Sequence, residues 1–143
     1  MPVMPMPPAS DAKAATHLPP QSTWDAIVAS VPTTGRNVQQ VSMHLLRQVK
    51  AYHKVLATVC TTGKLELQLL VTVQVECYED SKLLKSFQDI VRLLYDLDVV
   101  QEDTIKFWYG KGSAVKGRNV FLKDMEPFIK WLDEAEEEEE DNE

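Results

Sequence analysis

The sequence predicts an all-α fold, a stack of antiparallel helix pairs, from three observations. Its 143 residues suit one domain, and its hydrophobic content of 44% is close to the norm for a chain with a folded core. Apolar residues recur every three or four positions along most of the chain. Short polar segments separate these stretches, as between helices that turn back on one another. Helix pairs of this length, without an exact repeat, suit an irregular helical solenoid.

The N-terminal segment 1–21 is predicted to be a disordered, Pro-rich lead. It holds six of the eight prolines, and its few large apolar residues show no periodicity. Helical structure is expected from Ser22, because Ser22-Thr23-Trp24-Asp25 resembles a capping box with Asp25 reaching back to the cap. This first helix should stop before Pro32, since the residue that precedes a proline avoids helical angles.

The second predicted helix is the clearest element of the sequence. Its apolar residues are spaced three or four positions apart and draw one stripe along about six turns. Gly63 is expected to end this helix, in the way that helices commonly end. The residues of the stripe are Val38, Val41, Leu45, Val49, Tyr52, Leu56 and Val59.

The next segment, Leu65 to Glu76, has two conflicting patterns. Apolar and polar residues alternate with period two, which by local rules is a strand signal. Leu65, Leu69, Val73 and Cys77 also line up at helical spacing. No second convincing strand exists to pair with the segment, and a lone strand cannot satisfy its backbone. We therefore predict a buried helix.

Three further helices are predicted in the C-terminal half. Asp80 should cap the first, which ends at Asp96-Leu97-Asp98, and the second should run from Gln101 to Tyr109. The last contains Pro127, which should either kink it or open a fresh helix at that point. The apolar positions of the first and last are Leu83, Leu84, Phe87, Ile90, Val91, Leu94, Phe121, Met125, Phe128 and Leu132.

Charge is distributed unevenly along the chain. From Asp124 to the C-terminus there are eleven acidic residues and one base, so this part carries −10, whereas the part before it carries +3. Blocks of like charge stay solvated and often serve as interaction tails, although such a tail can also act only as a solubilising segment. Nucleic acid is not an expected partner of the acidic end, because phosphate repels carboxylate.

The residue pattern predicts no enzyme, no metal site and no cofactor. Cys60 and Cys77 fall in apolar stretches, far from a Cys-x-x-Cys spacing and without an activating neighbour. His44 and His53 fall on roughly opposite sides of their helix, which argues against a shared metal ion. No run approaches the ~20 apolar residues of a membrane helix, and no secretory signal is recognised. A cytoplasmic location without a membrane partner is the simplest expectation.

Aromatic residues gather near the C-terminus. Phe107-Trp108-Tyr109 precedes a Gly-rich break, and Trp131 stands just before a run of carboxylates. Aromatic residues at helical spacing usually belong to the core, and we expect this of Trp108 and Phe128. Trp131 is different, because a ring beside carboxylates such as Asp133 can offer lysine side chains both an apolar face and a cation–π surface.

Four stretches of the sequence carry a family pattern. They are Glu76-Cys77-Tyr78-Glu79-Asp80, Leu94 to Val100, Glu102 to Tyr109, and Pro127 to Leu132 with the acidic tail. Together they resemble the two-tryptophan (W-two) domain of translation initiation factors, whose two tryptophans would match Trp108 and Trp131. The sequence is most similar to the basic leucine zipper and two-tryptophan domain proteins, also called factor-five mimics. The similarity runs from about Trp24 to the C-terminus.

The resemblance implies an irregular HEAT-like stack and two acidic–aromatic boxes. In relatives these boxes bind lysine-rich segments of the beta subunit of initiation factor two, and the domain also contacts initiation factors three and one. The candidate partner-binding residues are Tyr78, Glu79, Asp80, Trp108, Tyr109, Trp131, Asp133, Glu134, Glu136, Glu137, Glu138, Glu139 and Glu140.

The predicted organisation is a lead at 1–21, a helical W-two-like domain at 22–135 and an acidic tail at 136–143. A complete domain of the family would begin with additional helices, so the resemblance implies a truncated W-two domain. Missing helix pairs would expose the apolar face of the helix at 36–60, because stacked repeats bury their cores against neighbours. The isolated chain would then be marginally stable or would self-associate.

Three hypotheses describe the function. The leading one is a non-catalytic adaptor that binds lysine-rich segments of initiation factors and modulates translation initiation by competing with factor five. The alternative is a general helical-repeat interaction fragment with a solubilising acidic tail and no ribosomal role. A third is a nucleotide-exchange or GTPase-regulating activity.

Overall fold

The computed structural model describes residues 19–111 and 117–141, with the helix backbone alone described for 136–141. This part of the chain contains seven helices and no strand, so the all-α prediction is confirmed. The helices are α2 (Pro20–Ala29), α3 (Val38–Ala51), α4 (His53–Val59), α5 (Gly63–Glu79), α6 (Phe87–Asp96), α7 (Glu102–Lys111) and α8 (Arg118–Asp141).

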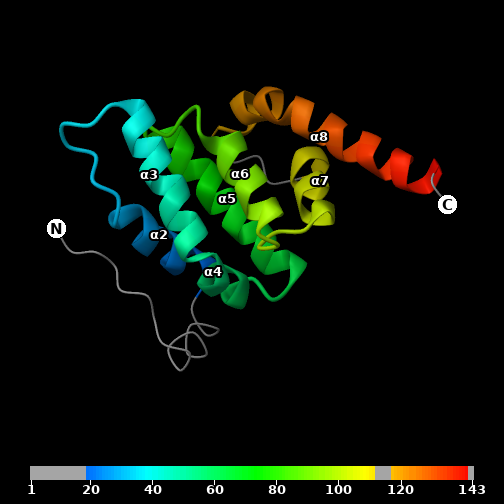
Figure 1. The fold of residues 1–143 in the computed structure, drawn as a ribbon, viewed down its shortest axis with the longest axis horizontal. Coiled ribbons are helices and arrows are strands. Elements are labelled where there is room, and N and C mark those ends of the chain that lie inside the picture. Colours follow the sequence, from blue (N-terminus) through cyan, green and yellow to red (C-terminus); the bar gives the residue numbers. More distant parts are fainter. Residues whose placement is uncertain (1–18, 112–116, 142–143) are drawn as a thin grey trace.

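The helices pack in two layers (Figure 1). Helix α5 lies between α2 and α7 in one layer, and α6 lies between α3 and α8 in the other. The layers contact each other mainly through helices that follow one another in the chain: α2 packs on α3, α5 on α6, and α7 on α8. Helix α2 also packs on α4. This is the predicted stack of helix pairs. The C-terminal part of α8 projects beyond the other helices.

Helix α2 begins earlier than predicted. Pro20 occupies the first turn and Pro19 is the N-cap residue, so the capping box expected at Ser22 is absent. Proline suits this place, because its fixed φ angle fits a helix and its missing N–H would have no partner there. The helix ends at Ala29, ahead of Pro32, as predicted. Its inner face buries Trp24 completely.

The predicted second helix is divided in two at Tyr52, whose φ of −108° and ψ of 16° separate α3 from α4. Asn37 caps α3 through a capping box with Gln40. The predicted exposure of the apolar stripe is wrong: from Val41 to Val59 it is buried, because α2 packs against both α3 and α4. Only Val38, at the start of α3, is exposed among the stripe residues.

Helix α5 confirms the helical interpretation of the ambiguous segment. Its buried positions, including Leu69, Val73 and Cys77, face α2 and α7 at helical spacing, so packing on two sides outweighs the local strand pattern. Gly63 begins this helix and does not end the previous one, which corrects the prediction. The Thr62 hydroxyl accepts the N–H of Leu65 at 3.2 Å and caps the first turn.

Helix α6 begins later than predicted. Asp80 does not cap it. Its carboxylate accepts the N–H of Lys82 at 2.9 Å within a series of turns, and the helix begins only at Phe87.

Helix α7 starts close to the predicted place, and the buried carboxylate of Glu66 on α5 accepts hydrogen bonds at its N-terminus. That carboxylate accepts the N–H of Gln101 at 2.6 Å and the hydroxyl of Thr104 at 3.1 Å. A carboxylate is favourable there because the helix dipole is positive at that end.

Helix α8 is one continuous helix with Pro127 inside it, so of the two alternatives predicted for this residue, a kink or a fresh helix, the fresh helix is excluded. Its inward face buries Phe121, Met125 and Leu132. The helix backbone continues beyond residue 135, where the domain was expected to give way to the acidic tail.

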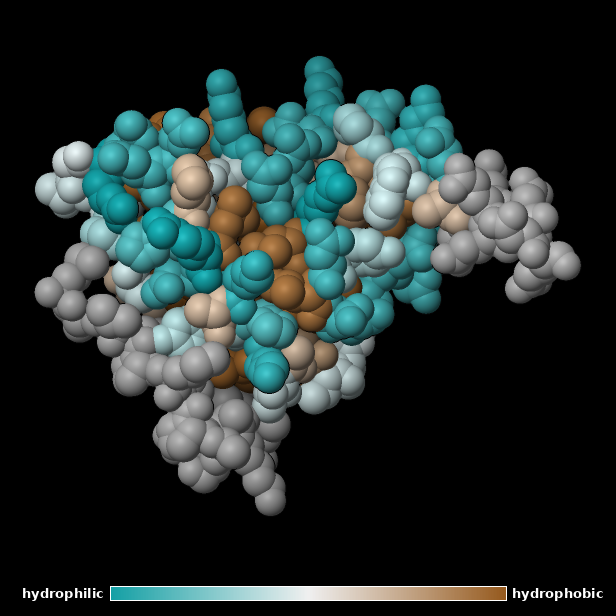
Figure 2. Space-filling view, in the orientation of Figure 1, coloured by the Kyte–Doolittle hydropathy of each residue, from teal (hydrophilic) through white to brown (hydrophobic). Residues whose placement is uncertain are grey.

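Apolar and hydrophilic residues are both visible on the surface. On the face shown in Figure 2, apolar residues gather in the middle and hydrophilic residues surround them. None of the described helices is long and apolar enough to span a bilayer. The large apolar side chains that remain exposed among the described residues are Val38, Met43, Tyr78, Phe107, Val120 and Trp131.

Burial of the α3 stripe is tested by two substitutions on the same helix. Leu45→Ala should lower the free energy of unfolding by about 2–5 kcal/mol, because it removes a buried leucine and leaves a cavity. Met43→Ala, at a residue that is 55% exposed, should change it by about 0.5 kcal/mol or less. Chemical denaturation measures both. Equal effects would contradict the placement of the stripe in the core.

Candidate functional site

A cluster of three aromatic rings lies where α8 crosses α6. Phe128 and Trp131 stack with their ring centroids 5.8 Å apart and their planes 15° from parallel. Tyr95 of α6 meets both rings edge-on, at 5.8 Å from Phe128 and 6.4 Å from Trp131. Trp131 remains 46% exposed, so the cluster joins the core to the surface.

Helical spacing divides the residues of α8 between core and surface. Phe128 and Trp131 are three positions apart and therefore neighbours on one face. Leu132 turns inward and is buried, whereas Phe128 is half-buried and packs against the core. The prediction that Leu132 belongs to the core is confirmed, whereas Phe128, predicted to be core with it, is only partly buried. Trp131, the candidate for contact, is accessible.

A cation from α6 already lies against the cluster. The guanidinium carbon of Arg92 is 5.9 Å from the centroid of the Trp131 ring, within the range of a cation–π contact. The same residues border a hollow of about 260 Å³ between α6 and α8, which is lined by Gln88, Asp89, Arg92, Pro127, Phe128 and Trp131. Arg92 was not among the predicted site residues, because its contact with Trp131 joins residues 39 positions apart on different helices.

The carboxylates next to Trp131 differ in their surroundings. Asp133 forms an ion pair with Lys106 of α7 at 3.0 Å, and Lys106 also pairs with Glu102 at 3.1 Å. Glu134 is exposed. The side chains of the remaining predicted residues, Glu136, Glu137, Glu138, Glu139 and Glu140, lie outside the described part of the structure.

Trp108 belongs to the core and is not available for contact with a partner. It is 1% exposed, and its indole N–H donates to Oε1 of the buried Gln74 at 2.8 Å. Phe87 packs against its ring at 5.2 Å. Arg118 lies 5.7 Å from the ring centroid and donates to the backbone carbonyls of Trp108 and Tyr109. We therefore exclude Trp108 from the contact surface, and Tyr109 is only half-buried beside it.

The other predicted residues form a second patch at the C-terminal end of α5. Tyr78 and Glu79 are exposed there, and Asp80 is half-buried. Tyr78 packs against Gly117, which has a φ of +86°; a Cβ atom at this glycine would lie 2.8 Å from the tyrosine side chain. Since Gly117 precedes the first residue of α8, this patch and Trp131 are roughly 20 Å apart along that helix.

Glu76 adds a perturbed carboxylate to the second patch. Burial raises its pKa, and the negative charges of Asp25, Asp80 and Glu79 raise that pKa further. Neither Asp25 nor Glu76 was predicted as a site residue. Asp25 is on α2, and only the folded structure brings it close enough to Glu76 to affect its pKa. The patch is a concentration of negative charge from two helices.

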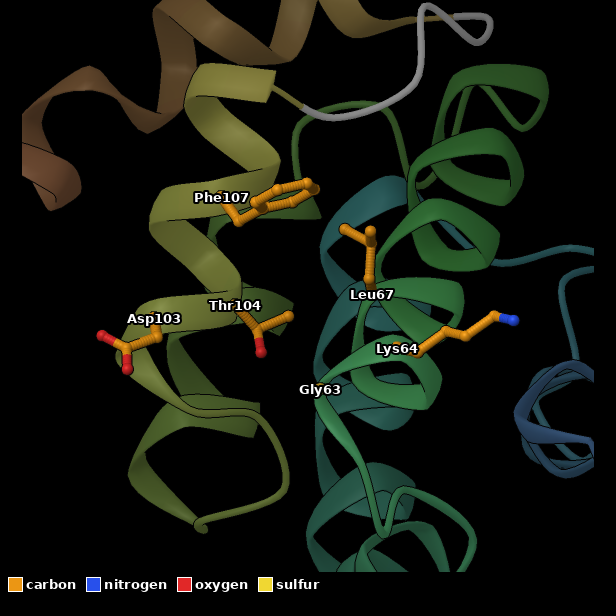
Figure 3. Close-up of a pocket in the computed structure, with 6 residues that line it drawn as sticks. All are labelled: Gly63, Lys64, Leu67, Asp103, Thr104 and Phe107. Atoms are coloured by element: carbon orange, nitrogen blue, oxygen red, sulfur yellow. The ribbon is translucent and has the colours of Figure 1, made fainter.

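A separate hollow of about 420 Å³ lies between α5 and α7. Figure 3 shows Phe107 and Thr104 of α7 on one side of it and Leu67 of α5 on the other. The side chains of Asp103 and Lys64 point away. Its walls are therefore mainly apolar and bring together no set of acid, base and nucleophile.

The cysteines are also poorly suited to reaction. Burial raises the pKa of Cys60 and of Cys77 to about 12, and nearby carboxylates act in the same direction. Both thiols therefore stay protonated near neutral pH, and the thiolate is the reactive form. Within residues 19–111 and 117–135, no group of His, Cys, Asp and Glu is placed to hold a metal ion.

The raised pKa of Glu76 predicts a pH-dependent stability. The folded state holds this proton more tightly than the unfolded chain does, so the protein loses stability as pH rises through the folded-state pKa. Glu76→Gln removes that loss and should raise the Tm at pH 7. The gain should shrink as the pH falls and wild-type Glu76 takes up its proton. Thermal unfolding between about pH 4 and pH 8, a range that covers the titration of a carboxyl group with a raised pKa, measures this. Glu126→Gln, at an exposed position of α8, is the control.

The sequence matches a family model described as W2: eIF4-gamma/eIF5/eIF2-epsilon, over residues 65–142. This match covers α5 to α8, and with them both candidate patches. No solved structure was found to match the chain.

Curated relatives extend the match toward the N-terminus. The chain is 38% identical over 120 residues to eIF5-mimic protein 2-A of Danio rerio, which covers 84% of this chain and 28% of that protein. It is 39% identical over 117 residues to eIF5-mimic protein 1 of Mus musculus and 36% identical over 117 residues to eIF5-mimic protein 2 of Homo sapiens. Each of these two matches covers 82% of this chain and 28% of the relative.

These matches agree with the helical stack and with the aromatic and acidic stretches of α5 to α8. They confirm the resemblance to the two-tryptophan domain and to the factor-five mimics, and they do not extend to a leucine zipper. The chain belongs to the W2 domain family of eIF4-gamma, eIF5 and eIF2-epsilon.

Proposed function

We propose that this chain is a non-catalytic adaptor that binds lysine-rich segments of translation initiation factors. The observation that carries the proposal is the half-exposed Trp131, which lies on a stacked aromatic cluster and is followed directly by carboxylates. The family match and the similarity to eIF5-mimic proteins support a role in translation initiation.

The chemistry of this surface suits lysine. The aliphatic stem of a lysine can lie on the exposed face of the aromatic cluster while its ammonium group reaches a carboxylate. A cation–π contact at an exposed site contributes about 0.5–1 kcal/mol, and an exposed ion pair typically contributes about 0.2–1 kcal/mol. A single lysine would therefore bind weakly, and useful affinity requires several lysines acting together.

The proposed partner is the lysine-rich segment of the beta subunit of initiation factor two, with initiation factors three and one as further candidates. By occupying that segment the chain would compete with factor five in the cytoplasm. This choice of partner rests on the family resemblance. The surface around Trp131 adds only the requirement for clustered positive charge.

One observation favours the alternative, a helical interaction fragment whose acidic end serves solubility. Asp133 is already paired with Lys106 within the chain, so this carboxylate is in part a structural link between α7 and α8. The alternative predicts that removing Trp131 leaves partner binding unchanged.

The first test compares two half-exposed aromatic residues. Trp131→Ala should weaken binding of a lysine-run peptide by roughly twofold to fivefold, the loss of one exposed cation–π contact. Phe107→Ala removes a similarly exposed ring from α7 and should leave the affinity unchanged. Isothermal titration calorimetry at low salt measures both. Equal affinities for wild type and Trp131→Ala would contradict the proposed contact.

Trp108→Ala serves as the core control in this experiment. It should lower the free energy of unfolding by about 3–5 kcal/mol, whereas Trp131→Ala should not melt the fold. Circular dichroism of each variant separates loss of folding from loss of contact.

The second test concerns charge. Binding should weaken as salt rises, because the Debye length falls from about 10 Å at 0.1 M to about 3 Å at 1 M. Deleting residues 136–143 should weaken binding at low salt and flatten the salt dependence. If the peptide binds the chain that lacks residues 136–143 as tightly as it binds the full chain, the acidic end has no role in binding. The role of Trp131 would then be decided by the first test alone.

A further inference from the structure

Two cations of the chain itself occupy the surface on which the proposed function depends. Arg92 lies 5.9 Å from the Trp131 ring centroid, where a lysine of the partner would be expected. Lys106 lies 3.0 Å from the Asp133 carboxylate, the first acidic group after that ring. The Trp131 ring and the Asp133 carboxylate thus each have a cation of the chain as partner.

These cations come from the two helices that flank α8. Arg92 is on α6 and Lys106 is on α7, and both helices pack against α8. Trp131 and Asp133 therefore receive one cation from each layer of the stack. The arrangement is a property of the tertiary fold, because neither cation is a sequence neighbour of the group that it contacts.

Each cation also has a carboxylate nearby other than the group that it contacts at the surface. Lys106 pairs with Glu102 at 3.1 Å and keeps that contact if Asp133 turns to another partner. Asp89 and Asp96 stand three and four positions from Arg92 on α6, which makes them its neighbours on the helix surface. All three side chains line the groove between α3 and α6, which Arg47 and Lys50 of α3 also line. A displaced Arg92 therefore has two carboxylates to approach, which it shares with these two cations.

We propose that Arg92 and Lys106 act as internal competitors that the cations of a partner must replace, and that they restrict the surface to partners with clustered lysines. This inference rests on the proposed function. An isolated lysine must displace an internal cation that is held at high effective concentration, and it gains only one weak contact. A run of lysines can replace both cations at once and has the exposed Glu134 as a further acidic partner. Arg92 and Lys106 thus determine specificity without being part of the contact.

The test uses the full chain with Arg92→Met and Lys106→Met, separately and together. Methionine keeps an unbranched apolar stem and removes the charge, so the packing beside Trp131 changes little while the competing positive charge is lost. Two peptides of equal length serve as probes. One carries consecutive lysines and the other carries two lysines separated by Gly and Ser.

The matched control is Lys123→Met combined with Lys130→Met. Both lysines are exposed on α8. This double variant loses two positive charges, the same number as Arg92→Met/Lys106→Met. It corrects for the general rise in attraction between a more acidic chain and a basic peptide.

Each single variant should bind the separated-lysine peptide roughly twofold to fivefold more tightly than wild type, the size of one exposed cation contact. The double variant should combine both gains and reduce the preference for consecutive lysines. Affinities no greater than those of the Lys123/Lys130 control would overturn the inference, even if wild type binds the lysine run as proposed.

If wild type binds neither peptide, the proposed function is contradicted. The inference about Arg92 can then still be tested by a measurement that needs no partner. Trp131 is the exposed tryptophan, whereas Trp24 and Trp108 are buried, so quenching of fluorescence reports on Trp131. Arg92→Met should increase quenching by caesium ions more than quenching by neutral acrylamide. Equal changes for the two quenchers, or no change, would mean that Arg92 does not exclude cations from the ring.

Discussion

Helix α5 is enclosed by α2 and α7 in its own layer and packs on α6 of the other, and the arrangement of the stack depends on this burial. Two polar side chains on α5 fix the position of α7. Glu66 accepts hydrogen bonds at the N-terminus of α7, and Gln74 accepts the indole N–H of Trp108 one turn before its end. Because buried polar groups are costly when unpaired, these bonds allow one register between the two helices.

The candidate site follows from that register. With α7 fixed on α5, Trp108 enters the core and Lys106 reaches the Asp133 carboxylate on α8. The other end of the surface depends on α6, which supplies Tyr95 and Arg92 to the ring of Trp131. The surface that we propose binds a basic partner thus carries two cations of its own, and the proposed selectivity for clustered charge rests on competition between these weak contacts and those of the partner.

Much of the fold could be predicted from the sequence, because helical periodicity is a local property. The stripe from Val41 to Val59 and the inward positions of α8 follow the spacing of apolar residues. The errors occur where packing or a turn overrides local rules. Gly63 begins a helix because Thr62 supplies the cap, and Asp80 forms a turn with Lys82 where a helix was expected.

By itself the sequence determined the helical class, the position of Trp131 beside a run of acids, and the family. Only the tertiary structure decided that Trp108 and Trp131 have opposite environments, with Trp108 1% and Trp131 46% exposed. It also decided which side chains of different helices lie close together: Asp25 and Glu76, Lys106 and Asp133, and Arg92 and Trp131. The physical reason is that periodicity reports which face of a helix is apolar, whereas contacts between faces depend on how separate helices pack.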